Sequence, residues 1–596
     1  NAKGWRGRNL MKNLKQSIGY FVKYMKPFKN SVLIMVFLLL IAMIAQVVAP
    51  YYMGQAVTSL GRFLAHKSHA MADFRQFMLL MCAAFFFQVF AQLVAWVIMS
   101  VFNAEATNSM RISLFKKLQK MTIRYFDTHQ DGKLLALFNS DIDNIFNALN
   151  GAIFDLVSQT ILFVGTIVVM FAINVKLALV TMASTPIVVL IAFSVMKKAR
   201  KYLDEQQEDI SVLNGYINEQ LNGERIILAN GLQKSSIAGF VKKNDKLRKT
   251  MFRGQFYSGL MFPMMQGLSM LNLAIVISVG TLIVVESGMS LAVGMGLIVT
   301  FVQYSQTYFI PLINLTSFYS MIQLALTGAK RLSDVEAEKE EDEVSSGINM
   351  QGINESVALK DVHFSYEKGK EILHGINLTI PRGKTLALVG PTGSGKTTTM
   401  NLFSRFYDVD SGTVEFDGTD VRKFSLDSVR NHIGIVLQDS ILFTGTIADN
   451  IRFGKPDATM EEVRSAAQKA QIADFIESLP DGYETKISDE QSLFSKGQKQ
   501  LMSIARTLLS DPEFLVLDEA TSNVDTVTEE KIQKAMDIVM EGRTSFVIAH
   551  RLKTIVNADE IAVLKDGSVI EQGSHEELLA KGGFYHNLYV NQMVLD

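Results

Sequence analysis

The sequence contains a single cysteine, Cys82, which lies inside a run of apolar residues. One thiol allows neither a disulfide within the chain nor a cysteine-based metal cluster, so both are excluded. An excess of charge is missing as well, because 58 basic and 59 acidic residues give a formal net charge of -1. A chain without a basic excess is not a candidate for binding nucleic acid.

The first half of the chain contains six long apolar stretches with few ionisable residues. These cover residues 31–53, 77–102, 153–173, 177–197, 259–285 and 291–319. A helix needs about 20 apolar residues to cross the hydrocarbon core of a bilayer, so each stretch is predicted to be a membrane span. The near absence of charge inside them disfavours a proton relay or a dedicated ion path.

Aromatic, methionine and amide side chains take the place of charge in these spans. Examples are Phe85, Phe86, Gln88, Met261, Met264, Met265, Gln303, Tyr304 and Tyr308. Such side chains repack around varied apolar ligands, and they serve equally for contact with lipid or for helix packing. Pro263 and Pro311 are predicted to kink the fifth and sixth spans, because a proline removes a helical hydrogen bond.

Two long polar segments join the second span to the third and the fourth span to the fifth. They hold most of the basic residues of the first half, among them Arg111, Lys116, Lys117, Lys197, Lys198 and Arg200. Positive charge favours the cytoplasmic side of a membrane, so both segments, both termini and the second half of the chain are expected in the cytosol. Apolar residues recur at helical spacing along both segments, which predicts helical extensions of the spans.

Each polar segment contains a local break, one at residues 126–132 and one at 214–219. A short helix at each break would either dock onto the second half of the chain or only cap the long helices, and the residues leave both interpretations open. The third and fourth spans are separated by Asn174, Val175 and Lys176 alone, which predicts a tight hairpin.

The second half of the chain reads as a soluble α/β domain. An acidic run from Asp334 to Glu343 indicates a solvated linker, which divides the chain into a membrane domain at 1–333, a linker at 334–355 and the α/β domain at 356–596. Residues 357–366 predict an opening strand, and the apolar residues 385–389 predict a buried strand that leads into a glycine-rich loop.

That loop reads Gly390, Pro391, Thr392, Gly393, Ser394, Gly395, Lys396 and Thr397, with Thr398 next in the chain. A loop of this pattern between a strand and a helix binds the phosphates of a nucleoside triphosphate. Its glycines let backbone N–H groups converge on phosphate oxygens, and the helix N-terminus adds a favourable dipole. We expect Lys396 to reach the β and γ phosphates of ATP and Thr397 to bind Mg²⁺.

Two further apolar strands end in residues suited to ATP hydrolysis. The strand at 514–518 ends in Asp518 and is followed by Glu519, so that Asp518 is expected to hold Mg²⁺ and Glu519 to polarise the attacking water. The strand at 545–549 is followed by His550. A lone histidine is usually structural, but this position at the same edge of the sheet predicts a sensor of the γ-phosphate.

In this order, and attached to six spans, these residues resemble the half-transporter type of the ATP-binding cassette (ABC) exporters over nearly the whole chain. The resemblance implies that Tyr366 stacks on adenine, that Gln438 touches Mg²⁺ and senses the membrane domain, and that Asp525 lies in a loop that communicates across a dimer. It also implies that 126–132 and 214–223 are intracellular loops with coupling helices. The expected fold is therefore an α-helical membrane domain of six spans fused to an α/β P-loop ATPase.

In this family, ATP lies between the phosphate loop of one cassette and the signature loop of another. The family pattern Leu-Ser-Gly-Gly-Gln reads here Phe494, Ser495, Lys496, Gly497 and Gln498. Lys496 replaces a glycine whose missing side chain permits close approach to the γ-phosphate, and residues 488–491 also depart from the usual Gly-Glu-Arg-Gly.

These departures, beside an intact phosphate loop, imply one half of a heterodimer with one competent and one degenerate ATP site. Glu519 would serve the hydrolytic site together with the partner's signature loop. The altered signature loop would form a slow site, and the partner is expected to carry a weaker base, Asp, at the position that matches Glu519. A homodimer that tolerates Lys496 is the alternative.

The resemblance thus implies ATP-driven multidrug export, of the bacterial type, across the cytoplasmic membrane by alternating access. The implied ligands are ATP and Mg²⁺, and the implied partners are a homologous half-transporter, membrane lipids and hydrophobic small molecules. A lipid or peptide exporter stays open, because a weakly charged cavity suits drugs and lipids alike. An ATP-gated channel would need charged pore-lining residues and a regulatory insertion, and neither is evident.

Overall fold

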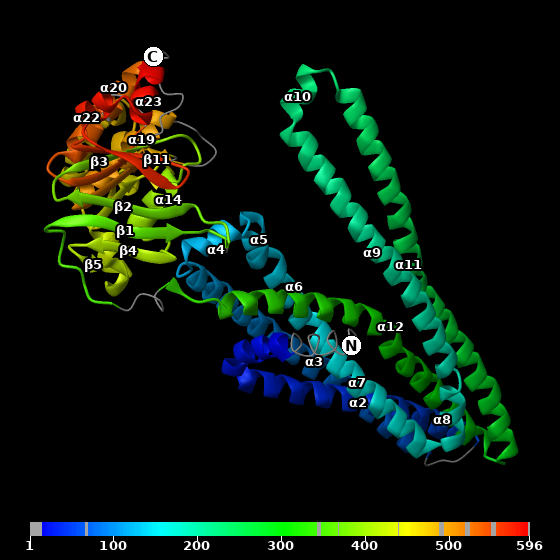
Figure 1. Ribbon diagram of the computed structural model, residues 1–596. Coiled ribbons are helices and arrows are strands. Elements are labelled where there is room, and N and C mark those ends of the chain that lie inside the picture. Colours follow the sequence, from blue (N-terminus) through cyan, green and yellow to red (C-terminus); the bar gives the residue numbers. More distant parts are fainter. Residues whose placement is uncertain are drawn as a thin grey trace. The chain divides into compact units, whose positions relative to one another are not determined.

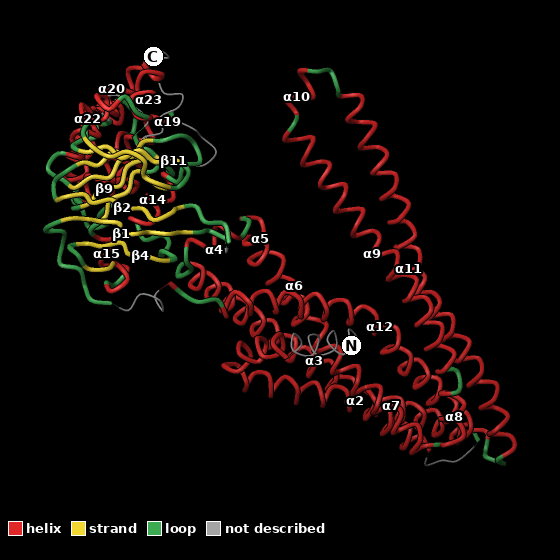
Figure 2. Tube along the Cα trace, in the orientation of Figure 1, coloured by secondary structure: helices red, strands yellow, loops and turns green. Residues whose placement is uncertain are grey.

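The computed structural model describes residues 15–65, 70–341, 347–367, 369–438, 440–487, 494–518, 525–549 and 556–593. They form two compact units, one from Asn1–Leu118 and Asp131–Ala337 and the other from Gln119–Gln130 and Glu338–Asp596. The described part of the first unit is helical, and the named strands all belong to the second (Figure 2). The chain therefore passes from the first unit to the second within the stretch predicted as a linker, because helix α12 continues to Ala337.

The first unit consists of long helices and short connecting turns. Its described helices are η1 Lys26–Phe28, α2 Lys29–Leu64, α3 Ala70–Leu118, α5 Asp131–Ala136, η2 Leu137–Asp141, α6 Ile142–Asn147, η3 Ala148–Ala152, α7 Ile153–Ile173, α8 Val175–Met182, α9 Thr185–Asn222, α10 Glu224–Ala229, α11 Gln233–Glu286 and α12 Leu291–Ala337. Five helical stretches among the described residues are long and apolar enough to cross a membrane: Lys15–Leu64, Ala70–Leu118, Asp131–Ile173, Val175–Asn222 and Gln233–Glu286. They contain the first five predicted spans, and the sixth, which falls on α12, stays a prediction.

Two details of these spans differ from the sequence prediction. The fourth span is interrupted, because α8 ends at Met182 and α9 starts at Thr185. Pro186 in the first turn of α9 has no N–H to donate to the carbonyl of Met182, which ends the first helix there. The hairpin before it is tighter than predicted, since Asn174 alone separates α7 from α8 and its side chain accepts a hydrogen bond of 3.1 Å from the Leu177 N–H. Both prolines predicted to kink spans, Pro263 and Pro311, lie inside helices that continue past them.

The break predicted at 214–219 is wrong. Helix α9 runs through these residues and ends only at Gly223, after which α10 forms the short helix. A single glycine such as Gly215 costs a helix interior only about 1 kcal/mol and does not end it. Helices α9 and α11 run side by side as a long hairpin with α10 at its tip (Figure 1).

The break predicted at 126–132 is confirmed. The short helix α4, Ile123–Thr128, ends at His129, and α5 starts at Asp131. Helix α4 belongs to the second unit, so this segment docks onto the ATPase half and does more than cap α3. The docking interpretation that the sequence left open is therefore the correct one for this first loop.

The second unit is built on two larger sheets and a short two-stranded one. Its strands are β1 Ser356–Phe364, β2 Leu373–Pro381, β3 Thr385–Val389, β4 Ser411–Phe416, β5 Thr419–Asp420, β6 Ile433–Val436, β7 Gly445–Thr446, β8 Lys486–Ile487, β9 Phe514–Asp518, β10 Thr544–Ile548, β11 Glu560–Lys565 and β12 Ser568–Gly573. The antiparallel sheet has the order β2-β1-β4-β5, and the six-stranded sheet has the order β12-β11-β3-β10-β9-β6. Its central strands are parallel, as expected for an α/β domain.

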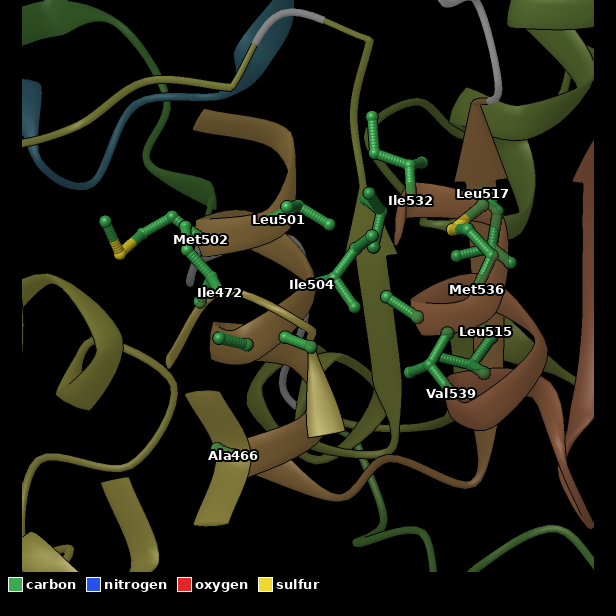
Figure 3. Packing of buried hydrophobic residues seen from close by; sticks show 14 of the residues in the cluster. Ala466, Ile472, Leu501, Met502, Ile504, Leu515, Leu517, Ile532, Met536 and Val539 are labelled. Atoms are coloured by element: carbon green, nitrogen blue, oxygen red, sulfur yellow. The ribbon is translucent and has the colours of Figure 1, made fainter. Parts of the chain in front are cut away.

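Helices cover the sheets and complete the core of this unit. They are α14 Lys396–Phe403, η4 Val421–Lys423, α15 Leu426–Asn431, α16 Ile447–Arg452, α17 Met460–Lys469, α18 Ala473–Glu477, η5 Gly482–Glu484, α19 Lys496–Ser510, α20 Thr526–Met540, α22 His575–Lys581 and α23 Phe584–Met593. Figure 3 shows Leu501 and Ile504 of α19 and Met536 of α20 packed around Leu515 and Leu517 of β9. This packing fixes the helix that follows the signature loop against the strand that ends in Asp518.

Candidate functional site

Four parallel strands bring the predicted phosphate loop, Gln438 and Asp518 to one edge of the six-stranded sheet. Strand β3 lies beside β10, β10 beside β9 and β9 beside β6. In register, Leu388 of β3 pairs with Ile548, Ile548 with Asp518, and Leu517 with Val436 of β6. The carboxyl ends of parallel strands meet at a common edge, and ligands of α/β sheets bind outside that edge.

The glycine loop leaves β3 at this edge and takes backbone conformations that require glycine. Gly393 has φ 82° and Gly395 has φ 106°, in the region that L side chains rarely adopt. A Cβ atom on Gly390 would lie 2.1 Å from the carbonyl oxygen of Leu564 in β11, so no side chain fits there. Gly395 directly precedes α14, which places the N-terminus of that helix at the end of the loop.

The ammonium group of Lys396 lies over the loop itself. It donates hydrogen bonds of 2.7 Å to the carbonyl of Gly390 and 3.0 Å to that of Pro391, and the side chain is buried. Burial lowers the pKa of Lys396 below its ordinary value, while the carboxylate of Asp518 acts in the opposite sense. A cation held among carbonyls in this way is positioned for phosphate oxygens.

The hydroxyl of Ser394 gives independent support for an anion at the loop. Ser394 is 3% exposed, and its Oγ has no hydrogen-bond partner among the described residues. A buried hydroxyl without a partner costs free energy, which a phosphate oxygen would offset. Thr392 and Thr397 are exposed, whereas Thr398 is buried at the start of α14.

The donor set at this edge fits Mg²⁺. Thr397 offers a hydroxyl, Gln438 after β6 offers an exposed amide, and Asp518 at the end of β9 offers a carboxylate. Oxygen ligands of these kinds are the ones that Mg²⁺ prefers, usually together with phosphate oxygens and water. Glu519 and His550 lie outside the described residues, although each directly follows a residue that is described.

The predicted adenine-stacking residue, Tyr366, lies just after β1 and is half-buried. Its hydroxyl accepts a hydrogen bond of 3.1 Å from Asn401 Nδ2 of α14. Its ring meets Phe364 and Tyr407 edge-on, with centroid distances of 4.9 and 5.0 Å. Sequence reasoning missed Asn401 and Tyr407, because no motif marks them and only the fold brings them to Tyr366.

The signature loop starts helix α19. Ser495 is its N-cap, and Ser495 and Gln498 form a reciprocal capping box with hydrogen bonds of 2.8 and 3.2 Å. Lys496 is exposed in the first turn, Gly497 is buried, and Phe494 packs against Phe475. A lysine at a helix N-terminus is unfavourable for the helix dipole, so helix stability does not explain it.

Asp525, the remaining predicted residue of the dimer-facing loop, caps a helix. It is the N-cap of α20 and accepts a hydrogen bond of 2.9 Å from the Thr528 N–H, which lowers the pKa of its carboxyl. Residues 488–491, which depart from the family pattern, lie outside the described residues, and so do residues 522–524 of the loop that ends in Asp525.

Comparison with known proteins agrees with both halves of this architecture. The family model "ABC transporter transmembrane region" matches residues 32–312, and the model "ABC transporter" matches residues 373–522. An uncharacterized ABC transporter ATP-binding protein, YfiC, of Bacillus subtilis is 38% identical over 590 residues, which are 99% of this chain and 96% of that protein.

Two further relatives have names that state a cargo. The probable multidrug resistance ABC transporter ATP-binding/permease protein YheH of Bacillus subtilis is 36% identical over 84% of this chain and 74% of its own. The fatty acid ABC transporter ATP-binding/permease protein of Mycobacterium bovis is 36% identical over 84% of this chain and 79% of its own.

Proposed function

The chain belongs to the ABC transporter family and couples ATP hydrolysis to transport across a membrane, and from this premise we propose that it is one subunit of a heterodimeric exporter of hydrophobic or amphipathic compounds. Its membrane helices and ATPase unit are fused in one polypeptide, as in its relatives. The observation that carries the proposal is the contrast between an intact phosphate-binding edge and a signature loop with Lys496 at its centre.

At the hydrolytic site, this chain supplies the phosphate loop and the residues after β9. Lys396 and the backbone N–H groups of the loop would hold the ATP phosphates, and Ser394 would add a hydroxyl donor. Thr397, Gln438 and Asp518 would hold Mg²⁺, which neutralises phosphate charge when bound. Glu519 directly follows Asp518, the last residue of β9, in the chain, which supports its role as the base that polarises water, and His550 would contact the γ-phosphate.

At the second site, this chain supplies only the signature loop. Lys496 adds a long charged side chain where relatives with the usual pattern have glycine, so the N-terminus of α19 approaches a phosphate less closely. We propose that this site binds ATP and hydrolyses it slowly. The partner would then carry an intact signature loop and a weaker base at the position matching Glu519.

Two exposed apolar surfaces support an assembly of two chains. At the tip of the α9–α11 hairpin, Ile226 and Leu228 of α10 are 67% and 55% exposed. On the ATPase unit, Ile441, Phe443 and Phe453 are 70%, 47% and 62% exposed. Apolar patches outside a membrane usually mark interfaces, and we propose that each of these meets its counterpart on a homologous half-transporter. In the proposed dimer, the ATPase unit and both termini of each chain lie in the cytosol.

The test is drug-stimulated ATPase activity in lipid, measured for this chain alone and with a co-expressed homologous half-transporter encoded beside it. We expect activity only with the partner, and its near-complete loss in Glu519→Gln while ATP still binds. Near-normal turnover in Glu519→Gln would contradict the assignment of the base. Robust activity of the chain alone, raised further by Lys496→Gly, would show instead a homodimer that the lysine slows.

Lipid export is the second candidate function, and the fatty acid transporter of Mycobacterium bovis favours it. Reconstituted vesicles with a fluorescent dye cargo or a fluorescent fatty acid separate the two. Transport of the fatty acid but not of the dye would replace multidrug export with lipid export.

A further inference from the structure

On the side of the nucleotide, the sequence assigns the sensing of the membrane domain to Gln438, yet the structure contains a second connection on the adenine side. It lies wholly within the second unit, between helix α4 and the segment that follows α14. Tyr407, in that segment, is 6% exposed and contacts both α4 and the aromatic residues at the end of β1.

On the side of α4, two charged residues hold Tyr407. Its hydroxyl donates a hydrogen bond to the carboxylate of Asp127, and the guanidinium carbon of Arg124 lies 5.5 Å from the centroid of its ring. Both contacts are directional, because a charged acceptor fixes the hydroxyl and the cation fixes the ring face. A displacement of α4 therefore displaces the ring of Tyr407.

On the side of the nucleotide, the same ring supports Tyr366. The two rings meet at 86° with centroids 5.0 Å apart, and Phe364 contacts both of them edge-on. Edge-to-face aromatic pairs have a preferred geometry, so the orientation of Tyr366 depends on that of Tyr407. The Tyr366 hydroxyl is bound to Asn401 of α14, the helix that starts at the phosphate loop.

The position of α4 allows such a movement. A cavity of about 320 Å³ borders Thr122, Arg124 and Tyr407, so this side of the helix is not close-packed against the ATPase unit. The other end of the segment is attached through backbone, since the Glu341 N–H donates a hydrogen bond of 2.8 Å to the Lys120 carbonyl. The cavity and this backbone attachment both lie at the N-terminal end of α4, while Asp127 near its C-terminal end is held by Tyr407.

We propose that Tyr407 is a positioning residue that links the adenine-stacking ring of Tyr366 to the coupling helix α4. Adenine bound against Tyr366 fixes that ring, the fixed ring restrains Tyr407, and Tyr407 restrains α4 through Asp127. ATP binding then orders α4 by a route separate from Gln438 and the phosphates. This inference rests on the proposed stacking role of Tyr366.

Hydrogen exchange of residues 119–130 in the full-length protein, reconstituted in lipid, tests the route. In the wild-type protein, saturating ATP is expected to slow exchange of this segment by roughly threefold or more, as for a locally ordered helix. Inorganic tripolyphosphate, which occupies the phosphate loop without a base, is expected to leave it unchanged. Tyr407→Phe and Asp127→Asn should each abolish the ATP effect, and the double variant should be no worse than either, because both remove one shared interaction.

Tyr483→Phe is the matched control, since Tyr483 is a buried tyrosine of the same unit whose hydroxyl has no partner among the described residues. It should keep the full ATP effect. Persistence of the ATP effect in Tyr407→Phe, or an equal effect of tripolyphosphate in the wild type, would overturn the inference. The proposed role of Tyr366 is tested separately by ATP affinity: an unchanged affinity in Tyr366→Ala would refute adenine stacking itself, whatever the exchange data show.

Discussion

The close crossing of helices α2 and α12 offers a sharp test of the packing in the first unit. Helices α2 and α12 cross where Gly54 and Gly296 face each other, each followed four residues later by Thr58 or Thr300. A Cβ atom added to Gly54 would lie 2.6 Å from the carbonyl oxygen of Gly296, and one added to Gly296 would lie 2.3 Å from that of Gly54. Small residues at such spacing let helix backbones pack closely within a bilayer.

The two threonines complete this crossing. The hydroxyl of Thr58 donates a hydrogen bond of 3.0 Å to the Gly54 carbonyl, and that of Thr300 donates one of 2.9 Å to the Gly296 carbonyl. Because each hydroxyl forms its hydrogen bond within its own helix, neither needs a polar partner on the opposite helix, and each threonine side chain packs against the opposite glycine. The Cβ of an alanine at Gly54 would lie 1.7 Å from Thr300 Oγ1 and would also clash with the backbone oxygen of Gly296. The Thr300 side chain can rotate away, but the backbone oxygen cannot. The helices themselves must separate.

We therefore expect Gly54→Ala and Gly296→Ala each to destabilise the protein by about 1–3 kcal/mol, the usual cost of overpacking a well-packed contact. A loss of about 2 kcal/mol corresponds to a melting temperature lower by roughly 4–8 °C for a unit of a few hundred residues. The double variant should cost less than the sum, because the first alanine has already separated the backbones.

Gly267→Ala in α11 is the matched control, because a Cβ there meets no atom within 4 Å. Alanine is the better helix former by about 1 kcal/mol, so this variant should be neutral or stabilised. The assay is thermal denaturation in one detergent at one scan rate, followed by size-exclusion chromatography, since unfolding of such proteins is commonly irreversible. Melting temperatures of Gly54→Ala and Gly296→Ala equal to that of Gly267→Ala would refute the close crossing.

Two further predictions concern the ATPase unit. Glu371 accepts a hydrogen bond from His363 and raises the pKa of His363 above its ordinary value. The contribution of this pair to stability is therefore present below the ordinary pKa of histidine and is lost as the pH rises through the raised pKa. The difference in melting temperature between wild type and His363→Gln should shrink as the pH is raised, and a constant difference would contradict the ion pair. Ser495→Ala should destabilise the unit by about 1 kcal/mol through loss of an N-cap. Ser574→Ala removes an equivalent capping box and should lower the melting temperature by the same amount. A reduced rate of ATP turnover in Ser495→Ala alone would separate the role of the signature loop from simple capping.

The parts that the sequence predicts correctly are those whose evidence is contiguous in the chain. The strand at 385–389 and the glycine loop after it form the structure expected from them, because an apolar strand followed by glycines has few alternatives. Helical extensions were likewise predictable from their periodicity, as in α3 and α9. The exact ends were not: no local residue type distinguishes the tolerated Gly215 from the terminating Gly223.

Contacts between distant segments account for what sequence reasoning missed. Tyr407 and Asp127 are 280 positions apart; Asp127 lies in the predicted coupling loop, but Tyr407 belongs to no motif, so only the docking of α4 on the ATPase unit brings them together. The same holds for Gly54 and Gly296, which look like ordinary helical glycines until α2 and α12 cross. If Tyr407→Phe uncouples α4 from ATP while Gly54→Ala leaves that coupling intact, the adenine-side connection acts locally within the second unit. Loss of coupling in both variants would mean instead that the response of α4 depends on the packing of the membrane helices, and a role for Tyr407 as a local link would then be untenable.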